Sequence, residues 1–537
     1  MDTIGLDLRK RESQLCINEV KELGSAMRGR ISYIGRACSA SRPTDKTMNR
    51  LARPALVRPA LSPNLTRRME MTLHRTLRHT LAFALLGPPA AAGAQAFGLN
   101  EMGSCAEARG FAATAAPCDD ASSIYWNPGA LPKTRGFSIY GGAAIIKIKG
   151  DFTRDTSFTS YNAEAPTAIV PHLFIDYRGA GKLAFGLGAY VPYGLTSQWG
   201  DNFPGRFSAK KAALQTIYVQ PNIAYQLTDN WSVGGGPIYG HSTVELIQAV
   251  DLSGQTATVI NGNPITFGQL GIPKYTEFAR ARLKGSASAF GVTLGVHGKL
   301  TPTWEMGVRF LSQLSFNYDN ADATFEARPT GLVLAANNPL GAPPGTPVDA
   351  LLASQFTAPD GALTAQKVST QIRHPAQIQA GFAYTGFERT TLSLDYAYVG
   401  WKSFNQLPVT FKGKAPSKVL VEDYNNISSI RLGVEHRMTN GVALRGGLSA
   451  ATSAAPNETV TPLLPEMDRG YGMFGAGIPL MGRFALDAAY AHVFTSGRRG
   501  RIDERAAGST SAQALALNSG VYSLSANILS FSLKASF

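Results

Sequence analysis

Residues 304–318 read Trp-Glu-Met-Gly-Val-Arg-Phe-Leu-Ser-Gln-Leu-Ser-Phe-Asn-Tyr. Apolar side chains occupy nearly every second position, and Glu305, Arg309, Gln313 and Asn317 fall between them. A period of two residues is that of a β-strand whose two faces meet different surroundings. A charge that faces lipid at mid-depth costs about 2–4 kcal/mol, so this pattern predicts a strand with lipid on its apolar face and a lumen on its polar face.

The same pattern recurs in fourteen segments of about ten residues. They cover residues 137–148, 168–178, 183–192, 214–227, 231–242, 286–299, 304–318, 376–386, 391–400, 428–438, 442–451, 471–480, 483–494 and 522–537. Short turns and long loops alternate between them, and the long loops are 149–167, 193–213, 243–285, 319–375, 401–427, 452–470 and 495–521. Outer-membrane barrels have an even number of strands, tight periplasmic turns and long outer loops. We therefore predict an all-β fold, with residues 137–537 forming a 14-stranded antiparallel transmembrane β-barrel.

The C-terminal segment carries two further signals. Residues 531–537 alternate up to a terminal phenylalanine, which resembles the signal read by the barrel-assembly machinery, so this machinery is an expected partner. The apolar residues before them have the opposite parity: Tyr522, Leu524, Ala526 and Ile528. This change predicts a β-bulge near Leu529.

Composition agrees with a membrane barrel. The 537 residues carry a net charge of +14, but charged residues make up only 16% and glycine accounts for 55 positions. Lysine and arginine do not cluster, so no nucleic-acid partner is expected. A hydrophobic content of 44% argues against wholesale disorder, and the absence of an 18-residue apolar run argues against a helical membrane protein. Residues 1–96 hold 16 of the 51 basic residues and 7 of the 37 acidic ones, so residues 97–537 have a net charge of only +5.

The N-terminal part predicts export. Residues 69–96 contain a basic start, an apolar stretch over 81–86 and small residues at Ala94 and Ala96, which is the pattern of a secretory signal peptide. Residues 1–68 show no periodic apolar face, and we interpret them as a misassigned start or a disordered leader. Together with the barrel, the signal predicts the outer membrane of a bacterium.

Cys105 and Cys118 follow the predicted cleavage site. They are either a disulfide, which the oxidising periplasm permits, or two free thiols, and we favour the disulfide. The sequence has no CxxC motif with a nearby histidine, so we predict neither a metal site nor a cofactor. It also lacks GxSxG and HExxH motifs, which argues against an enzyme.

Residues 97–136 do not follow the barrel pattern. They contain Asp119-Asp120-Ala-Ser-Ser and then Asn127-Pro128-Gly129. This part resembles the mature N-terminus of FadL-type long-chain fatty-acid transporters, and the resemblance continues at 401–407 and 464–469, so that it spans essentially all of 97–537. It implies that residues 97–136 form a small helical hatch, or plug, inside the lumen, with these five numbered residues in hatch gating. An ordinary turn is the alternative for 127–129. Gly129 stands where the family usually has alanine, which predicts a looser hatch.

The resemblance also implies a pathway for a hydrophobic ligand: capture by outer loops, a pocket beside the hatch, and lateral exit where the third strand kinks inward. Three residues of the third strand favour such a kink: Gly188, Pro192 and Gly194. Proline has no N–H group to donate to the neighbouring strand, and glycine has no side chain to pack. Loops 243–285 and 319–375 offer apolar candidates for ligand contact, unless they only cover one another: Phe267, Leu270 and Phe356. Arg309 and Arg431 are candidates for a carboxylate head group, unless they pair with lumen acids.

These features predict an outer-membrane uptake channel for hydrophobic compounds, most readily long-chain fatty acids, that works by passive diffusion. The alternatives are an aromatic-hydrocarbon channel, a general porin and a structural barrel. A hatch argues against the open porin. The expected partners are the hydrophobic ligand, outer-membrane lipid with its lipopolysaccharide, and the assembly machinery, and we expect a monomer.

Overall fold

The structure is a computed structural model that describes residues 96–336, 338–359, 361–500 and 518–537. The predictions for the leader (1–68) and for nearly all of the signal peptide (69–96) lie outside these ranges. Within the described ranges, no helix is long and apolar enough to cross a membrane.

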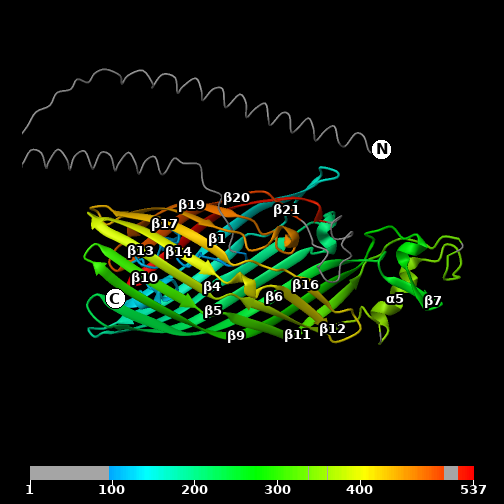
Figure 1. Ribbon diagram of the computed structural model, residues 1–537, viewed down its shortest axis with the longest axis horizontal. Helices are drawn as coiled ribbons and strands as arrows, with labels where there is room; N and C mark the ends of the chain where they lie inside the picture. The colour runs from blue at the N-terminus through cyan, green and yellow to red at the C-terminus, as the bar shows by residue number, and fades with distance from the viewer. Residues whose placement is uncertain (1–95, 337, 360, 501–517) are drawn as a thin grey trace, which may run out of the picture. The chain divides into compact units, whose positions relative to one another are not determined.

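Fourteen strand passes form the wall (Figure 1), and each falls on one of the predicted segments. The passes are β1 (Gly136–Arg154), β3 (Ala168–Arg178), β4 (Leu183–Gln198), β5 (Lys211–Gln226), β6 (Trp231–Asp251), β9 (Glu277–Thr301), β10 with β11 (Trp304–Leu311, Leu314–Ala327), β12 with β13 (Gln366–His374, Gln377–Phe387), β14 (Thr390–Val399), β17 (Ile427–Arg437), β18 (Ala443–Ala451), β19 (Arg469–Pro479), β20 (Phe484–Thr495) and β22 (Gly520–Ser536). Each pass pairs antiparallel with the next, and β22 pairs with β1 from Arg154↔Gly520 to Ser138↔Ser536. The sheet is therefore closed, and the predicted 14-stranded antiparallel barrel is confirmed.

In the half near the short turns, the two faces of the wall differ as the alternation predicts: polar side chains point inward and apolar ones point outward. Glu305 and Arg309 are buried inside, whereas Trp304 and Phe310 on the same strand are 45% and 36% exposed on the outside. The exposed side chains of this half form the lipid-facing surface.

The half near the long loops departs from the predicted parity. The pass over residues 304–318 is broken after residue 311, and beyond the break its apolar side chains turn inward and are at most 1% exposed: Leu314, Phe316 and Tyr318. The single apolar face predicted for this segment is therefore wrong beyond residue 311. The physical reason is that the lumen itself is apolar at this level.

The predicted bulge near Leu529 is also wrong. The register between β22 and β1 runs without a shift along the whole strand. Tyr522 and Ile528 point into the lumen, while Leu529 and Phe531 face outward. The parity changes because the inward face of β22 is apolar in its first half and polar in its second half, and no extra residue is inserted.

Residues 97–135 fill the lumen as a hatch built from α3 (Ser104–Ala108), α4 (Ser123–Trp126) and the 3-10 helix η1 (Pro128–Lys133). Almost every residue from Phe97 to Pro132 is buried. α3 contacts β18, β19, β20 and β22, and η1 contacts β4, β5, β6, β9 and β10. The predicted helical plug inside the barrel is thus what the structure shows.

The third and fourth long loops pack on each other beyond the barrel. They contribute β7 (Thr256–Ile260), β8 (Asn263–Thr266), η3 (Phe267–Leu270) and α5 (Val348–Thr357), and Figure 1 shows α5 and β7 past the barrel end opposite the C-terminus. The other loops carry β2 (Ser160–Asn162), η2 (Pro204–Phe207), η4 (Trp401–Ser403), β15 (Gln406–Phe411), β16 (Lys418–Val421), η5 (Asn457–Thr459) and β21 (Arg498–Gly500). By the usual orientation of such barrels, this end faces the cell exterior.

Candidate functional site

The hatch backbone lies directly on glycines of the barrel wall. At these positions a side chain would collide with hatch atoms: Gly234, Gly295, Gly307, Gly433, Gly447 and Gly475. They come from β6, β9, β10, β17, β18 and β19, so the hatch rests on a wide arc of the wall. This seat accounts for part of the high glycine content, because only glycine lets two backbones approach so closely.

Gly129 is part of the same close approach. A Cβ atom on Gly129 would lie 2.6 Å from the carbonyl oxygen of Gly295. The smaller residue therefore lets the hatch pack closely on β9. The looser hatch predicted from the missing methyl group stays a prediction. Pro128 lies against Gly234 in the same way.

Asn127 ties the two parts of the hatch to the wall. Its Nδ2 donates to the carbonyl oxygens of Thr114 (2.8 Å) and Val296 (3.0 Å), and its Oδ1 accepts from the Gly129 amide (3.0 Å). The last bond caps η1, which begins at Pro128. The residues predicted as an isolated turn or as a hatch element thus form a hydrogen-bonded junction.

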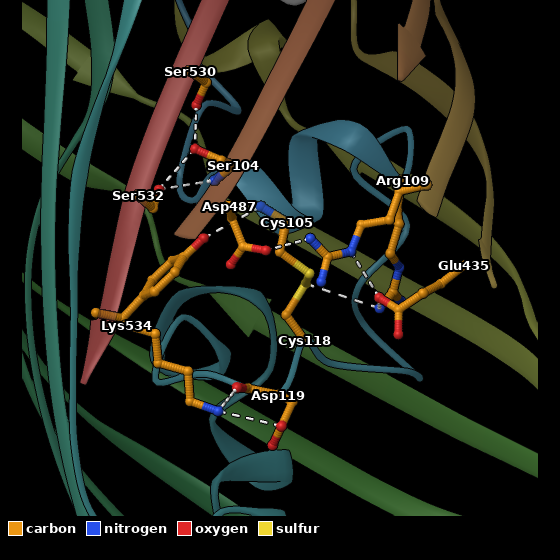
Figure 2. Close-up of polar contacts among 12 residues, drawn as sticks. Ser104, Cys105, Arg109, Cys118, Asp119, Glu435, Asp487, Ser530, Ser532 and Lys534 are labelled. Carbon is orange, nitrogen blue, oxygen red and sulfur yellow. Dashed lines mark hydrogen bonds and ion pairs between the residues drawn. A yellow bond between two sulfur atoms is a disulfide. The ribbon is translucent and has the colours of Figure 1, made fainter. Parts of the chain in front are cut away.

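Cys105 and Cys118 form a disulfide in the structure (Figure 2). Among the described residues, the cluster with metal-ligand atom types is Cys105, Cys118 and Asp120, but its two sulfurs are already joined. The covalent loop between them holds Arg109, whose guanidinium lies 3.8 Å from Glu435.

Asp119 and Asp120 have different surroundings. Asp119 is exposed and lies 3.2 Å from the ammonium of Lys534 (Figure 2). Asp120 is 2% exposed and its Oδ1 accepts a hydrogen bond from the Ser122 amide. Burial, with a smaller contribution from Asp487, raises the pKa of Asp120 to about 7.

Arg309 and Arg431 are buried beside adjacent hatch aromatics. The guanidinium of Arg309 lies 4.4 Å from the ring centre of Tyr125, and that of Arg431 lies 5.7 Å from the ring centre of Trp126. Each donates one hydrogen bond to an amide oxygen, and two nitrogens on each have no hydrogen-bond partner within the described part of the chain.

Three of the four acids of the predicted lumen network form ion pairs with other cations. Glu435 and Asp487 bind Arg445, and Glu305 binds Lys133. Arg309 and Arg431 form no ion pair with any described residue. The fourth acid of the predicted network, Asp395, is buried opposite Arg431 in the register of β14 and β17 and its charge acts on Arg431, so the network accounts for Arg431 in part and leaves Arg309 without an acid. Two buried cations with unused donors form a site suited to an anion.

A cavity of about 470 Å³ lies above the hatch, toward the long loops. Aliphatic residues line most of it, from β1, β3, β4, β5, β6 and β22 together with the hatch start and loop 452–470: Leu99, Ile146, Ile148, Val170, Val191, Leu195, Leu214, Val244, Leu464, Leu524 and Ile528. Glu101 and Tyr471 also line it. The neighbour of Glu101, Asn100, receives the hydrogen bond from Arg431, so the anion site lies next to the cavity floor.

The predicted capture residues do not line this cavity. Phe267 and Leu270 are 5% and 7% exposed and belong to an apolar cluster shared by the third and fourth loops, against which Phe356 packs. The structure therefore places them in the core of the loop module.

The wall is open between β3 and β4 at the level of the cavity. Their pairing stops at His172↔Tyr190 and contact resumes only where the Glu164 amide donates to the carbonyl oxygen of Gln198. Residues on both edges of this gap line the cavity: Ala165, Ala168, Ile169, Val170, Val191, Gly194, Leu195 and Thr196. The cavity thus reaches the lipid-facing side of the wall.

The gap begins at the kink predicted for the third strand. The pairing of β4 with β5 shifts between Tyr190 and Tyr193, on either side of Pro192. Pro171 in β3 also lacks an N–H group, so neither strand presents a full edge to the other. Gly194 lies at the gap, whereas Gly188 lies below it against Ile124 of the hatch.

The hatch start occupies the edge of β4 that β3 leaves free. The Leu99 amide donates to the Pro192 carbonyl (2.8 Å), and the Gly194 amide donates to the Phe97 carbonyl (3.0 Å). Phe97 and Leu99 carry no sequence pattern that predicts this role, whereas Pro171 is a proline inside a strand pattern, a signal that was available but not used.

Three separate segments meet around Phe97. Its ring contacts the rings of Tyr193, His374, Trp401 and Phe404 edge-on, at centre distances of 4.6–6.0 Å. Glu466 accepts a hydrogen bond from the Ala96 amide (3.1 Å). The resembling stretches 97–136, 401–407 and 464–469 are thus brought together at the hatch start.

Comparison with known proteins supports one family. Residues 89–537 match the model of a family described as outer membrane protein transport protein (OMPP1/FadL/TodX). Outer membrane protein P1 of Haemophilus influenzae is 24% identical over 77% of this chain and 89% of its own length. The long-chain fatty acid transport protein of Escherichia coli O6:H1 is 25% identical over 70% of this chain and 81% of its own length.

Solved structures share the fold. A Pseudomonas aeruginosa FadL homologue matches with a TM-score of 0.68 at 18% identity, covering 82% of this chain and 100% of that one. The Ralstonia pickettii toluene transporter TbuX matches with a TM-score of 0.55 at 18% identity, covering 82% and 99%.

Proposed function

This chain belongs to the OMPP1/FadL/TodX family and is an outer-membrane transport channel for hydrophobic compounds rather than an enzyme; on that premise we propose that its ligand is a long-chain fatty acid, taken up by passive diffusion. The observation that carries the proposal is the cavity of about 470 Å³, which is aliphatic over most of its lining and has an anion site beside its floor. Pockets of roughly 300–1,000 Å³ are typical of sites for small ligands.

The two ends of a fatty acid match the two parts of this site. Each methylene group removed from water contributes about 0.8 kcal/mol, which favours an aliphatic lining for the chain. A carboxylate would supply acceptors to the unused nitrogens of Arg309 and Arg431. The hydrophobic chain thus drives entry, and the head group selects for an acid.

The exit step follows from the gap between β3 and β4. Because the hatch start is hydrogen-bonded to Pro192 and Gly194, a movement of the hatch at Asp119, Asp120 and the 127–129 junction would be transmitted to the edge of the gap. The ligand would then leave sideways into the membrane, without crossing the hatch. In this scheme Gly188 seats the hatch below the opening.

An aromatic hydrocarbon is the second candidate ligand. The observation in its favour is the enclosure of the Phe97 ring by four other rings next to the cavity, an arrangement that suits another aromatic ring. A general porin is less well supported, because the buried hatch occupies the lumen. The C-terminal Phe537 remains our candidate signal for the assembly machinery, and a monomer remains the expected state.

Cellular uptake tests the proposal directly. Cells that lack their own transporter should accumulate labelled oleate when they express this chain, and Ala168→Trp, at the edge of the gap, should reduce uptake several-fold. Ala143→Trp on the outer face of β1 is the matched control and should retain uptake. Equal oleate uptake with and without the gene would refute the fatty-acid ligand. Thermal shift in detergent with oleate, toluene and an alkane then separates the two ligand classes.

A further inference from the structure

The lipid-facing side of β1, β22 and β20 changes character at one level. Ile145, Leu529 and Tyr490 lie side by side in register and point outward. Ile145 and Leu529 are 41% and 47% exposed, and the outward positions below them are also apolar, including Phe531 and Leu533. Toward the long loops, the next outward positions of β1 and β22 are polar, and Phe494 of β20 is a further exposed apolar side chain (58%).

The next outward row is polar. Two residues further along each strand, Lys147, Asn527 and His492 lie side by side. The Tyr490 hydroxyl donates to Oδ1 of Asn527 (2.7 Å), and Nδ1 of His492 lies 2.9 Å from the same oxygen. The oxygen of the amide is thus engaged twice, and its Nδ2 group remains available as a donor.

A second lysine extends this polar row. Lys149 follows Lys147 on the same exposed face of β1. Neither ammonium group has an ion-pair partner among the described residues. The acid on the same face, Asp151, instead accepts a hydrogen bond from Thr153. Donors beside hydrocarbon are costly unless an acceptor reaches them, so this face calls for an anionic partner.

The position of this polar row in the membrane indicates which anionic partner it meets. The row lies on the side of the apolar band toward the long loops, where the head groups of the outer leaflet are found. We infer that this face binds a phosphate of lipid A, the phosphorylated glycolipid that anchors lipopolysaccharide, through Lys147, Lys149 and Asn527. Charge-assisted hydrogen bonds hold the phosphate, and the acyl chains lie on the exposed apolar row below it.

Such a lipid would stand beside the lateral opening. β1 pairs with β3, and the far edge of β3 borders the gap, so one strand spacing of about 4.8 Å separates the two. Bound lipid A would therefore flank the outer-leaflet side of the exit. The inference holds whatever ligand the channel carries.

Binding of purified lipid A in detergent, followed by native mass spectrometry, tests the site. The wild-type chain should bind hexa-acylated lipid A that carries both phosphates, and Lys147→Gln/Lys149→Gln should bind it at least tenfold more weakly. Lys367→Gln/Lys412→Gln, which removes two exposed lysines on the opposite side of the barrel, in β12 and just after β15, is the matched control and should bind like the wild type. Heat-modifiable gel mobility verifies that each barrel is folded.

Three results would overturn the inference. One is equal affinity of the wild type and Lys147→Gln/Lys149→Gln for lipid A. Another is binding of phosphatidylglycerol as tight as that of lipid A, which would indicate a site for any anionic lipid. The third is full competition by millimolar inorganic phosphate, which would indicate a site for the free ion.

Discussion

The two halves of the lumen are packed in opposite ways. Near the short turns, glycines of the wall bring the hatch backbone into direct contact with the strands, and polar groups join the two. Near the long loops, apolar side chains point inward and leave a cavity of about 470 Å³. The first half is filled by the hatch and the second half holds the cavity, and the hatch start connects them.

This difference explains how one barrel can be closed along its axis and still be permeable through its side. The hatch lies in direct contact with glycines of six strands at this level, so we expect it to obstruct passage along the barrel axis. The cavity half has an opening in its side, between β3 and β4. Four experiments test this division.

The largest effect is expected from pH acting on Asp120 in the half that the hatch fills. Its pKa in the folded protein is about 7, against an ordinary value of 3.8. Because the pKa is raised, the stabilisation is fully present below pH 4 and is lost as the pH rises through 7. A shift of about three units corresponds to about 4 kcal/mol. Thermal unfolding from pH 4 to 8 should show this loss, and Asp120→Asn should remove it; the same pH profile in both proteins would contradict the assignment.

Gly447→Val tests the contact between hatch and wall. A Cβ atom at Gly447 would overlap the backbone of Arg109 and Gly110, so we expect a loss of about 3 kcal/mol of hatch stability and a rise in ion conductance in planar bilayers. Gly446→Val is the control, because a Cβ atom there has only Val434 as a neighbour, at 3.6 Å. If both variants conduct alike, the glycine seat does not seal the lumen.

Arg309→Gln/Arg431→Gln tests the boundary between the two halves. A hydrogen bond to a charged group contributes about 1.5–3 kcal/mol, so oleate should bind at least tenfold more weakly while toluene binding is unchanged. Arg373→Gln, on the outward face of β12, should change neither. Isothermal titration in detergent measures both ligands, and unchanged oleate affinity in the double variant would remove the anion site from the pathway.

Pro171→Val tests the gap between β3 and β4 at the side of the cavity. A residue with an N–H group would let β3 pair further along β4, narrowing the gap and slowing oleate uptake a few-fold. Pro237→Val, at a wall proline away from the gap that is paired with Val292 of β9, should have no effect on uptake. Faster uptake in Pro171→Val would show that the gap does not limit exit.

The alternation of residues was sufficient to predict the fold, because lipid imposes one constraint on every strand. It failed in the cavity half, at residues 314–318 and 522–528, because there the lumen is as apolar as the membrane and parity no longer distinguishes the two faces. Arg309, Arg431 and the 127–129 junction were predicted as candidates, but their partners were not, since Tyr125, Trp126 and Val296 meet them only through the barrel closure. Phe267, Leu270 and Phe356 pack within the loop module, because an apolar loop can cover itself as well as a ligand, and their contact with a ligand stays a prediction.

The joining of the last strand to the first has a consequence for biogenesis. The hatch is made before any strand, yet it ends up enclosed by a wall that is completed only when β22 meets β1. Once the wall glycines touch the hatch backbone, no room is left for the side chains of the hatch to slide past the wall. The N-terminal residues must therefore be in place before the barrel closes. The sheet then closes around a hatch that is already in position.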